Sequence, residues 1–357
     1  MKKEPMKFLF NKEDYKMAFG VKKLHLVDET PLQYLPNISQ ELGIEMYMKR
    51  DDLTPFGAGG NKLRKLEYLV QDALDKGATM LITVGGAQTN HGRLTAAVAA
   101  KYGLKCAIIA VDDYPGEVSA NILLDRILDC DLILKADDGR DEDEQFDELC
   151  PEIIKEYEEK GEKVYFIPMG GSNELGALGY YDCAVELDRQ AKEMGLEDAR
   201  VIESVGSMGT YMGLFCGLRN ENSPLRLTGI SISPFGRSKE RRIVEYFGQM
   251  KEKYGLAIDP SREDFDIQKD YTRGGYNNPC KEVRDAIYLM ARKEAIFLDP
   301  CYTGKGFAGI IDMVRDGKIK PGEKIIFIHT GGFPGLYTLH HRVEFEKELE
   351  SGIRIIK

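Results

Sequence analysis

Lys62 is the first residue in the sequence whose type and setting suggest chemistry. It follows the glycine-dense turn Gly57-Ala58-Gly59-Gly60 and opens a segment with apolar residues at helical spacing, namely Leu63, Leu66, Val70, Ala73 and Leu74. Glycines leave space around the amine, and the positive end of the helix dipole disfavours its protonated form. Lys62 is therefore a candidate nucleophile, with Asn61 as the predicted N-cap. Because most lysines beside glycines are solvated surface groups, this motif needs support from its context.

Two more loops carry groups that could bind anions. The segment 85–93 (Gly-Gly-Ala-Gln-Thr-Asn-His-Gly-Arg) leads from a predicted strand into a helix, a place where backbone amides and a hydroxyl bind a carboxylate. In the alternative interpretation, Thr89 or Asn90 only caps the helix. The segment 205–214 has glycines and two hydroxyls at a helix start, which describes a phosphate cradle, but its spacing is not that of a dinucleotide-binding fingerprint. A phosphate outside a dinucleotide, together with a reactive lysine, indicates pyridoxal phosphate.

The elements that must position these residues alternate along the chain. A strand at 45–53 follows a loop at 24–35 and precedes the Lys62 helix. A first series of elements has predicted strands at 80–84, 106–111, 131–134 and 164–168 and helices at 94–102 and 122–128. A second series has predicted helices at 174–194, 239–254 and 282–293 and strands at 200–203, 227–231 and 324–328. Short apolar strands separated by helices predict two doubly wound α/β units with parallel sheets, whose ligands bind at the carboxyl ends of the strands.

Composition narrows the class of partner. The 357 residues are 43% hydrophobic and 30% charged with a net charge of −10, which argues against nucleic acid or an anionic membrane as the main partner. Seven cysteines without a C-x-x-C pair predict reduced thiols in a cytoplasmic protein. The only apolar stretch near the N-terminus, residues 8–10, is too short for a signal peptide. The acidic run 137–148 lacks calcium-loop spacing, so we expect a solvated helix start and no metal site.

Several ordered motifs together resemble the fold-type II pyridoxal phosphate enzymes, in the branch that contains D-cysteine desulfhydrase and 1-aminocyclopropane-1-carboxylate deaminase. The resemblance extends from about residue 24 to 340. Its motifs are residues 59–66 (GGNKLRKL), 85–93, 170–173 (GGSN) with 176–180 (GALGY), 206–213, 299–305 (DPCYTGK) and 329–332 (HTGG).

The resemblance implies a fold and a set of roles. The fold is that of the tryptophan synthase β-subunit, with a larger domain of residues 1–64 and 171–357, a smaller inserted domain of 65–170, and cofactor and substrate in the cleft between them. The residues that match family positions are Lys62 as the Schiff-base lysine, Asn90 near the cofactor's 3′-oxygen, Thr89 and Asn90 around the substrate carboxylate, Gly206, Ser207, Met208, Gly209 and Thr210 as the phosphate loop, Tyr276 and Tyr302 as active-site tyrosines, and Thr330 and Thr303 near the pyridine nitrogen.

Some positions depart from the family pattern and bear on the substrate. Thr89 stands where serine is usual, Ala87 where a larger aliphatic residue is usual, and Met208 where glycine is common. Thr303 stands where the ring-opening deaminases are expected to have glutamate. A neutral partner favours a protonated pyridine less than an anion does, and the weaker electron sink suits α,β-elimination better than ring opening.

The predicted function is therefore an α,β-elimination lyase that converts D-cysteine to pyruvate, hydrogen sulfide and ammonia. Three alternatives stay open: cyclopropane deamination, elimination from another amino acid, and a pyridoxal-phosphate-binding protein without turnover. The resemblance also implies a homodimer. On the expected Lys62 helix, we predict that Lys65 lies away from the cleft.

Overall fold

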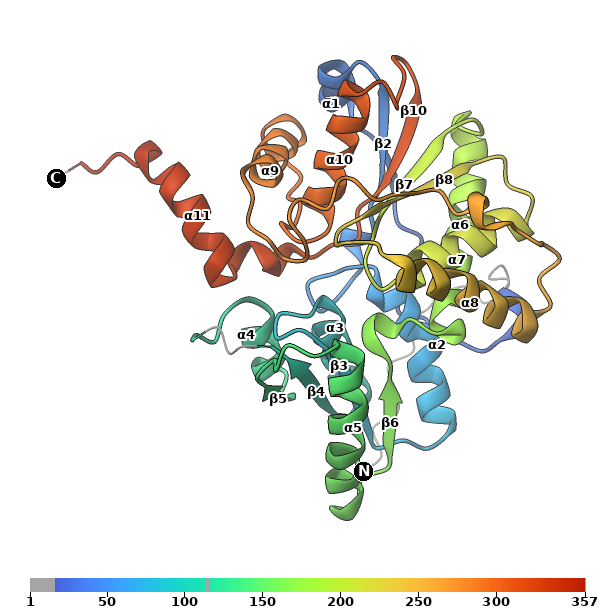
Figure 1. Cartoon of the computed structure of the whole chain (residues 1–357), viewed down its shortest axis with the longest axis vertical. Helices are drawn as coiled ribbons and strands as arrows, with labels where there is room; N and C mark the ends of the chain where they lie inside the picture. Colours follow the sequence, from blue (N-terminus) through green and yellow to red (C-terminus); the bar gives the residue numbers. More distant parts are fainter. Residues whose placement is uncertain (1–16, 113–115, 357) are drawn as a thin grey trace.

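The computed structural model describes residues 17–112 and 116–356 and contains two β-sheets flanked by helices (Figure 1). The larger sheet has the order β1-β2-β10-β7-β8-β9 and the smaller one the order β5-β4-β3-β6. Every pair of neighbouring strands is parallel except β1 with β2. The strands are β1 Leu32–Tyr34, β2 Glu45–Lys49, β3 Met80–Gly85, β4 Lys105–Val111, β5 Asp131–Lys135, β6 Val164–Ile167, β7 Arg200–Val205, β8 Arg226–Ser231, β9 Ile267–Gln268 and β10 Lys324–Ile328.

Helices connect most of these strands. The α-helices are α1 Pro36–Leu42, α2 Lys62–Asp75, α3 Asn90–Tyr102, α4 Ala120–Ile127, α5 Glu142–Glu159, α6 Glu174–Met194, α7 Gly209–Asn220, α8 Arg237–Tyr254, α9 Lys281–Glu294, α10 Thr303–Arg315 and α11 Leu339–Leu349. Short 3₁₀ turns occur at Ala18–Gly20, Asp51–Leu53, Met169–Gly171, Arg262–Asp264, Phe333–Tyr337 and Glu350–Gly352. Within the described residues, no helix is long and apolar enough to cross a membrane.

Both faces of the smaller sheet are buried. Leu81 of β3 and Ile108 of β4 pack with apolar residues of α2 and α3, whereas their chain neighbours Ile82 and Ile109 pack on the other face with Phe146 of α5. Side chains alternate between the two faces of a strand, so a continuous apolar run serves both layers. This burial explains why the sequence shows unbroken apolar strands here.

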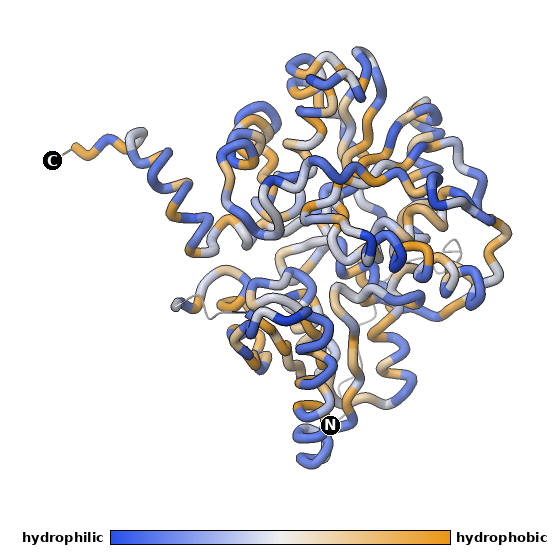
Figure 2. Tube along the Cα trace, in the orientation of Figure 1, coloured by the Kyte–Doolittle hydropathy of each residue, from blue (hydrophilic) through white to orange (hydrophobic). Residues whose placement is uncertain are grey.

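The larger sheet is covered in the same way. Val201 of β7 and Ile326 of β10 face the core formed with α6, α7 and α8, whereas Ile202 and Phe327 face the core formed with α1, α9 and α10. Figure 2 shows hydrophobic colour along the central strands and hydrophilic colour over much of the outer helices. The predicted fold class, two doubly wound α/β units with parallel sheets, is confirmed.

Several predicted elements need correction at their ends. The strand expected at 45–53 stops at Lys49 and continues as a 3₁₀ turn, and the loop expected at 24–35 contains β1. Helix α3 begins at Asn90 rather than Leu94. The acidic run is exposed up to Glu144 and its second half forms the start of α5, as expected, with the Asp141 carboxylate accepting the Asp143 N–H.

Candidate active site

Four helix N-termini provide the groups predicted to do chemistry. Helices α2, α3, α7 and α10 begin at Lys62, Asn90, Gly209 and Thr303, and the strands β3 and β7 run directly into the loops before α3 and α7. The first backbone N–H groups of a helix have no partner within the helix, and its dipole is positive at this end. A cluster of such ends favours an anionic ligand.

Hydrogen bonds join the starts of α2, α3 and α7 and connect α2 with the loop after β10. The Asn61 backbone N–H donates to the Thr330 carbonyl at 3.0 Å, and Asn61 Nδ2 donates to Thr210 Oγ1 at 3.0 Å. Arg93 Nη2 of α3 donates to the Gly59 carbonyl at 2.7 Å. Asn61 occupies the N-cap position, but its side chain does not cap α2 as predicted; it links the lysine turn to the loop before α7.

Lys62 and Lys65 lie together on α2. Burial lowers the pKa of Lys62 to about 8, against the opposing effect of Glu203. Lys65 is fully buried, its Nζ donates to the Gly170 carbonyl at 3.1 Å, and burial followed by the charge of Lys62 lowers its pKa well below the usual value. The prediction that Lys65 faces away from the cleft is wrong, because three residues on a helix turn 300° and so return to within 60° of the same side.

Glu203 of β7 is a carboxylate beside these two lysines that the sequence analysis did not identify. It is 2% exposed, and its Oε2 has no hydrogen-bond partner among the described residues. Burial raises its pKa to about 7, and Lys65 and Lys62 oppose this shift. A lone glutamate inside the apolar strand 200–205 was the available sequence signal.

The loop 206–210 brings together groups of the kind that bind a phosphate, and its assignment as the phosphate loop stays a prediction. Met208 has a left-handed backbone (φ +66°), so the chain turns sharply into α7. A Cβ at Gly209 would lie 2.6 Å from Ser172 Oγ and 2.7 Å from Lys65 Nζ, which shows how closely the backbone approaches these donors. Ser172 Oγ and Ser207 Oγ lie 2.8 Å apart. Helix amides, hydroxyls and a buried amine fit a phosphate group.

The loop before α3 combines the two roles considered for it. Thr89 Oγ1 accepts the Gly92 N–H at 3.3 Å, so Thr89 does cap the helix. A hydroxyl that accepts one bond can still donate its own proton, so binding of a carboxylate by Thr89 stays a prediction. Asn90 Oδ1 accepts from Asn121 Nδ2 at 2.9 Å and from Arg93 Nη1 at 3.4 Å.

The two predicted tyrosines meet at their hydroxyl groups. Tyr276 Oη and Tyr302 Oη lie 3.1 Å apart, and a Cβ at Gly206 would lie 2.9 Å from the Tyr302 ring. Asp299 accepts the Tyr302 N–H at 2.8 Å and so holds this residue at the start of α10. Burial raises the pKa of Tyr302 far above its usual value, which keeps the hydroxyl protonated and able to donate.

Thr303 and Thr330, the two threonines predicted to lie near the pyridine nitrogen, differ in their surroundings. Thr303 Oγ1 is buried, donates to Asp299 Oδ1 at 2.7 Å and accepts the Asp299 N–H at 2.8 Å. The Thr330 hydroxyl makes no hydrogen bond within the part of the chain that the structure describes. Thr330 therefore has the freer hydroxyl of the two, and the assignment of either to the cofactor ring stays a prediction.

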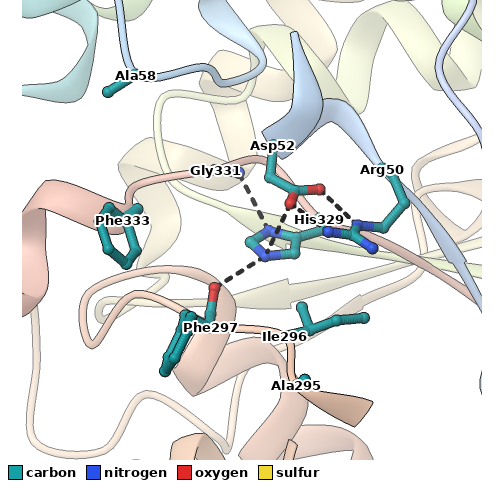
Figure 3. Close-up of a pocket in the computed structure, with 9 residues that line it drawn as sticks. All are labelled: Arg50, Asp52, Ala58, Ala295, Ile296, Phe297, His329, Gly331 and Phe333. Atoms are coloured by element: carbon teal, nitrogen blue, oxygen red, sulfur yellow. Dashed lines mark hydrogen bonds and ion pairs between the residues drawn. The ribbon is translucent and has the colours of Figure 1, made fainter. Parts of the chain in front are cut away.

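A pocket of about 270 Å³ lies beyond this cluster, next to Gly331 (Figure 3). His329 Nδ1 accepts the Gly331 N–H at 3.2 Å, so Nε2 carries the proton and donates to the Phe297 carbonyl at 3.1 Å. Burial lowers the pKa of His329, which keeps the ring neutral. Both ring nitrogens are engaged, and none of the residues predicted to be catalytic lines the pocket.

Comparisons with known proteins identify the family of this chain. Residues 24–331 match the family model described as pyridoxal-phosphate dependent enzyme. A D-cysteine desulfhydrase of Klebsiella pneumoniae is 41% identical over 322 residues, covering 87% of this chain and 94% of the relative. A Pyrococcus abyssi protein, provisionally named a 1-aminocyclopropane-1-carboxylate deaminase, is 38% identical over 310 residues, covering 87% and 91%.

The fold is also that of a solved relative. The crystal structure of a homologue of this deaminase superposes with a TM-score of 0.83 at 36% identity, covering 96% of this chain and all of the other. The predicted cofactor is thus the cofactor of the matching family. The chain belongs to the fold-type II pyridoxal-phosphate-dependent enzymes.

Proposed function

We propose that this enzyme eliminates the β-substituent of D-cysteine, so that D-cysteine and water give pyruvate, hydrogen sulfide and ammonia. The observation that carries the proposal is the half-buried, low-pKa amine of Lys62 beside the loop 206–210 and a pair of protonated tyrosine hydroxyls. The similarity to the Klebsiella pneumoniae desulfhydrase supports the choice of substrate.

The residues that would hold the cofactor follow from the contacts. Lys62 would bind its aldehyde, and the amides and hydroxyls of the loop 206–210 would bind its phosphate, with Lys65 Nζ as a further hydrogen-bond donor. Asn90 would lie near the ring oxygen and Thr330 near the ring nitrogen, as the family resemblance implies. When bound, pyridoxal phosphate supplies an electron sink for the pair released from the Cα–H bond.

Different side chains of the protein would carry out the separate steps of the reaction. The Thr89 hydroxyl and the first amides of α3 bind the substrate carboxylate. The Lys62 amine takes the Cα proton, since a pKa of about 8 makes it a competent base near neutral pH. The Tyr302 hydroxyl, in contact with Tyr276, gives a proton to the leaving sulfur.

Cyclopropane deamination is the second candidate, supported by the resemblance to the Pyrococcus abyssi protein and to the solved deaminase homologue. Against it stands Thr303, whose hydroxyl is bonded to Asp299 and which brings no anion to the ring nitrogen. Elimination from another amino acid and silent cofactor binding remain outcomes of the test.

The test is a panel of D- and L-amino acids and the cyclopropane amino acid, assayed for 2-oxo acid, ammonia and sulfide. Sulfide and pyruvate from D-cysteine, with little or no 2-oxobutanoate from the cyclopropane substrate, is the expected result. The reverse pattern would establish the deaminase, and no product from any substrate would indicate a binding protein.

We also propose the domain division 1–64 with 171–357, and 65–170. All strands of the smaller sheet lie between residues 80 and 167, and α2 contacts both α3 and α6, so the boundary passes through α2. The seven cysteines, none in a disulfide, support a cytoplasmic location.

A homodimer is proposed from an exposed aromatic cluster. Phe297, Phe333 and Tyr337 are 55%, 41% and 52% exposed, and the Phe333 ring lies 6.0 Å from that of Phe297 and 5.6 Å from that of Tyr337. Contiguous apolar surface of this kind marks an interaction site. Light scattering should give twice the chain mass, and Phe333→Asp should shift it toward the monomer.

A further inference from the structure

We propose that Asn121 of α4 is a positioning residue that, together with Arg93, fixes the side-chain amide of Asn90 so that its N–H₂ group faces the cofactor. Asn121 belongs to none of the loops that the sequence analysis connected with chemistry. The proposal rests on the proposed function, because it takes Asn90 as the residue next to the ring oxygen of pyridoxal phosphate.

The hydrogen-bond donors and acceptors around Asn121 allow only one orientation of its side-chain amide. Arg93 has no acceptor, so the atom of Asn121 that lies 3.0 Å from Arg93 Nη1 must be Oδ1. The other branch of Asn121 is then Nδ2, and it lies 2.7 Å from the Gln88 carbonyl, which can only accept. Reversing the amide of Asn121 would place Nδ2 against the Arg93 donor and Oδ1 against the Gln88 carbonyl, so only one orientation satisfies both neighbours.

The orientation of the Asn90 side-chain amide follows from its neighbours in the same way. Asn121 Nδ2 donates across 2.9 Å to Asn90, and Arg93 Nη1 lies 3.4 Å from the same atom, so this atom of Asn90 is Oδ1. Among the described residues, the hydrogen bonds of the Asn90 side chain all go to Oδ1. Its Nδ2 is therefore the free branch, and it can only donate.

Arg93 anchors the arrangement. Its side chain is completely buried, and Nη2 donates to the Gly59 carbonyl at 2.7 Å, two residues before the N-cap of α2. Asn121 is 1% exposed, and its backbone N–H donates to Gln88 Oε1 at 2.9 Å. Because both residues are buried and held by bonds other than those to Asn90, they can impose an orientation on it.

The consequence concerns charge on the cofactor ring. A donor favours the anionic form of the ring oxygen, whereas an acceptor at the same place disfavours it. A fixed Asn90 Nδ2 therefore lowers the pKa of the coupled proton that gives the bound cofactor its pH-dependent visible band. The pH midpoint of this absorption band can be measured without substrate turnover.

The decisive variant is Asn121→Asp. A carboxylate keeps the bond from Arg93 but has no N–H to offer Asn90, so Asn90 must reverse and present Oδ1 to the cofactor. We expect a folded, yellow protein in which the pH midpoint of the visible band rises by about one unit or more, a tenfold change in proton affinity. Asn121→Ala, which leaves Asn90 free to reverse, should show a smaller rise.

Gln88→Glu is the matched control. It adds the same charge at a residue hydrogen-bonded to Asn121 and removes the Gln88 Nε2 bond to the Ser119 carbonyl, but it leaves the amide of Asn90 held. Its midpoint should stay at the wild-type value. An unchanged midpoint in Asn121→Asp, or an equal rise in the control, would overturn the proposal. Failure of both Asn121 variants to fold would make Asn121 a structural residue and would overturn it as well.

Failure of the proposed function has a different signature. A wild-type protein that gains no visible band with pyridoxal phosphate contradicts the site itself. A wild-type protein that binds the cofactor but releases no sulfide from D-cysteine contradicts the substrate, and the spectroscopic test of Asn121 still stands.

Discussion

The hydroxyl oxygens of Tyr276 and Tyr302 lie 3.1 Å apart, next to the glycine that opens the phosphate loop. Asp299 fixes the backbone of Tyr302, and burial raises the pKa of both hydroxyls, so both stay protonated. Tyr302 is the less exposed of the two and is thus better placed to act on a substrate, with the half-exposed Tyr276 in support.

Tyr302→Phe should therefore lower kcat for sulfide release by about 10²–10⁴-fold, the usual effect of removing a general acid, with little change in bound cofactor. Tyr276→Phe should have a smaller effect. Steady-state kinetics with D-cysteine measure both. The control is Tyr34→Phe, because Tyr34 is an exposed tyrosine on the edge strand β1. Equal kcat in Tyr302→Phe and wild type would remove Tyr302 from the reaction.

Thr89→Ala should raise KM for D-cysteine, because a hydrogen bond to a charged carboxylate is worth about 1.5–3 kcal/mol. The variant also loses the bond to the Gly92 N–H, so a modest loss of stability is expected. Thr89→Ser keeps both functions of the hydroxyl and separates these effects from the loss of the methyl group. An unchanged KM in Thr89→Ala would leave Thr89 as a helix cap alone.

Lys65→Met should weaken binding of pyridoxal phosphate by about 10–100-fold, because it removes a buried donor beside the phosphate cradle. Binding of pyridoxal, which has no phosphate, should hardly change. Fluorescence or absorbance titration of the apoprotein with both compounds measures the difference. Equal losses for both compounds would place Lys65 away from the phosphate.

The pH dependence of the reaction between Lys62 and pyridoxal phosphate tests the interaction of Lys62 with Glu203. Only the neutral Lys62 amine reacts, and its pKa is about 8, so the rate of capture by the apoprotein should rise with pH through about 8 and then level off. Glu203 raises the pKa of Lys62, so Glu203→Gln should move this midpoint to lower pH. A midpoint that rises or stays fixed in Glu203→Gln would contradict the interaction.

The free energy of unfolding of the apoprotein should also depend on pH through Lys62. The folded state lowers the Lys62 pKa from 10.5 to about 8, so the unfolded chain binds more protons between these values. Stability should therefore gain from Lys62 as pH rises from about 8 to 10.5. Lys62→Met should lack this gain in denaturant titrations at the two pH values.

Local patterns predict the fold and the main loops because the signal and the structure lie in the same segment. Continuous apolar runs give the strands buried on both faces, and glycines with hydroxyls mark the turns before α3 and α7. Helix α10 was missed since its glycines suggest a loop. These glycines occur within the helix because neighbouring atoms leave no room for a side chain. A Cβ at Gly306 would lie 2.2 Å from Ser204 Oγ, and one at Gly304 would lie 2.6 Å from the Asp299 carbonyl.

The remaining parts of the site depend on contacts between distant segments. Glu203 meets the two lysines of α2 only when β7 and α2 are packed, and Asn121 reaches Asn90 across 31 positions of sequence. A lone glutamate within an apolar strand is a sequence signal for Glu203, but nothing in the residues around Asn121 marks that position. Lys65 could have been placed correctly, because its spacing from Lys62 is a neighbouring position on a helix.

Chemical labelling identifies which of the two lysines of α2 holds the cofactor. Lys65 is buried and Lys62 half-buried on one side of α2, and only one of them can form the bond. Borohydride reduction of the yellow holoprotein converts the lysine–cofactor bond into a stable amine, and mass spectrometry of proteolytic fragments locates it. We predict the label on Lys62, with no label in Lys62→Ala and an unchanged position in Lys65→Met. A label on Lys65, or on any other lysine, would exclude Lys62 as the residue that holds the cofactor.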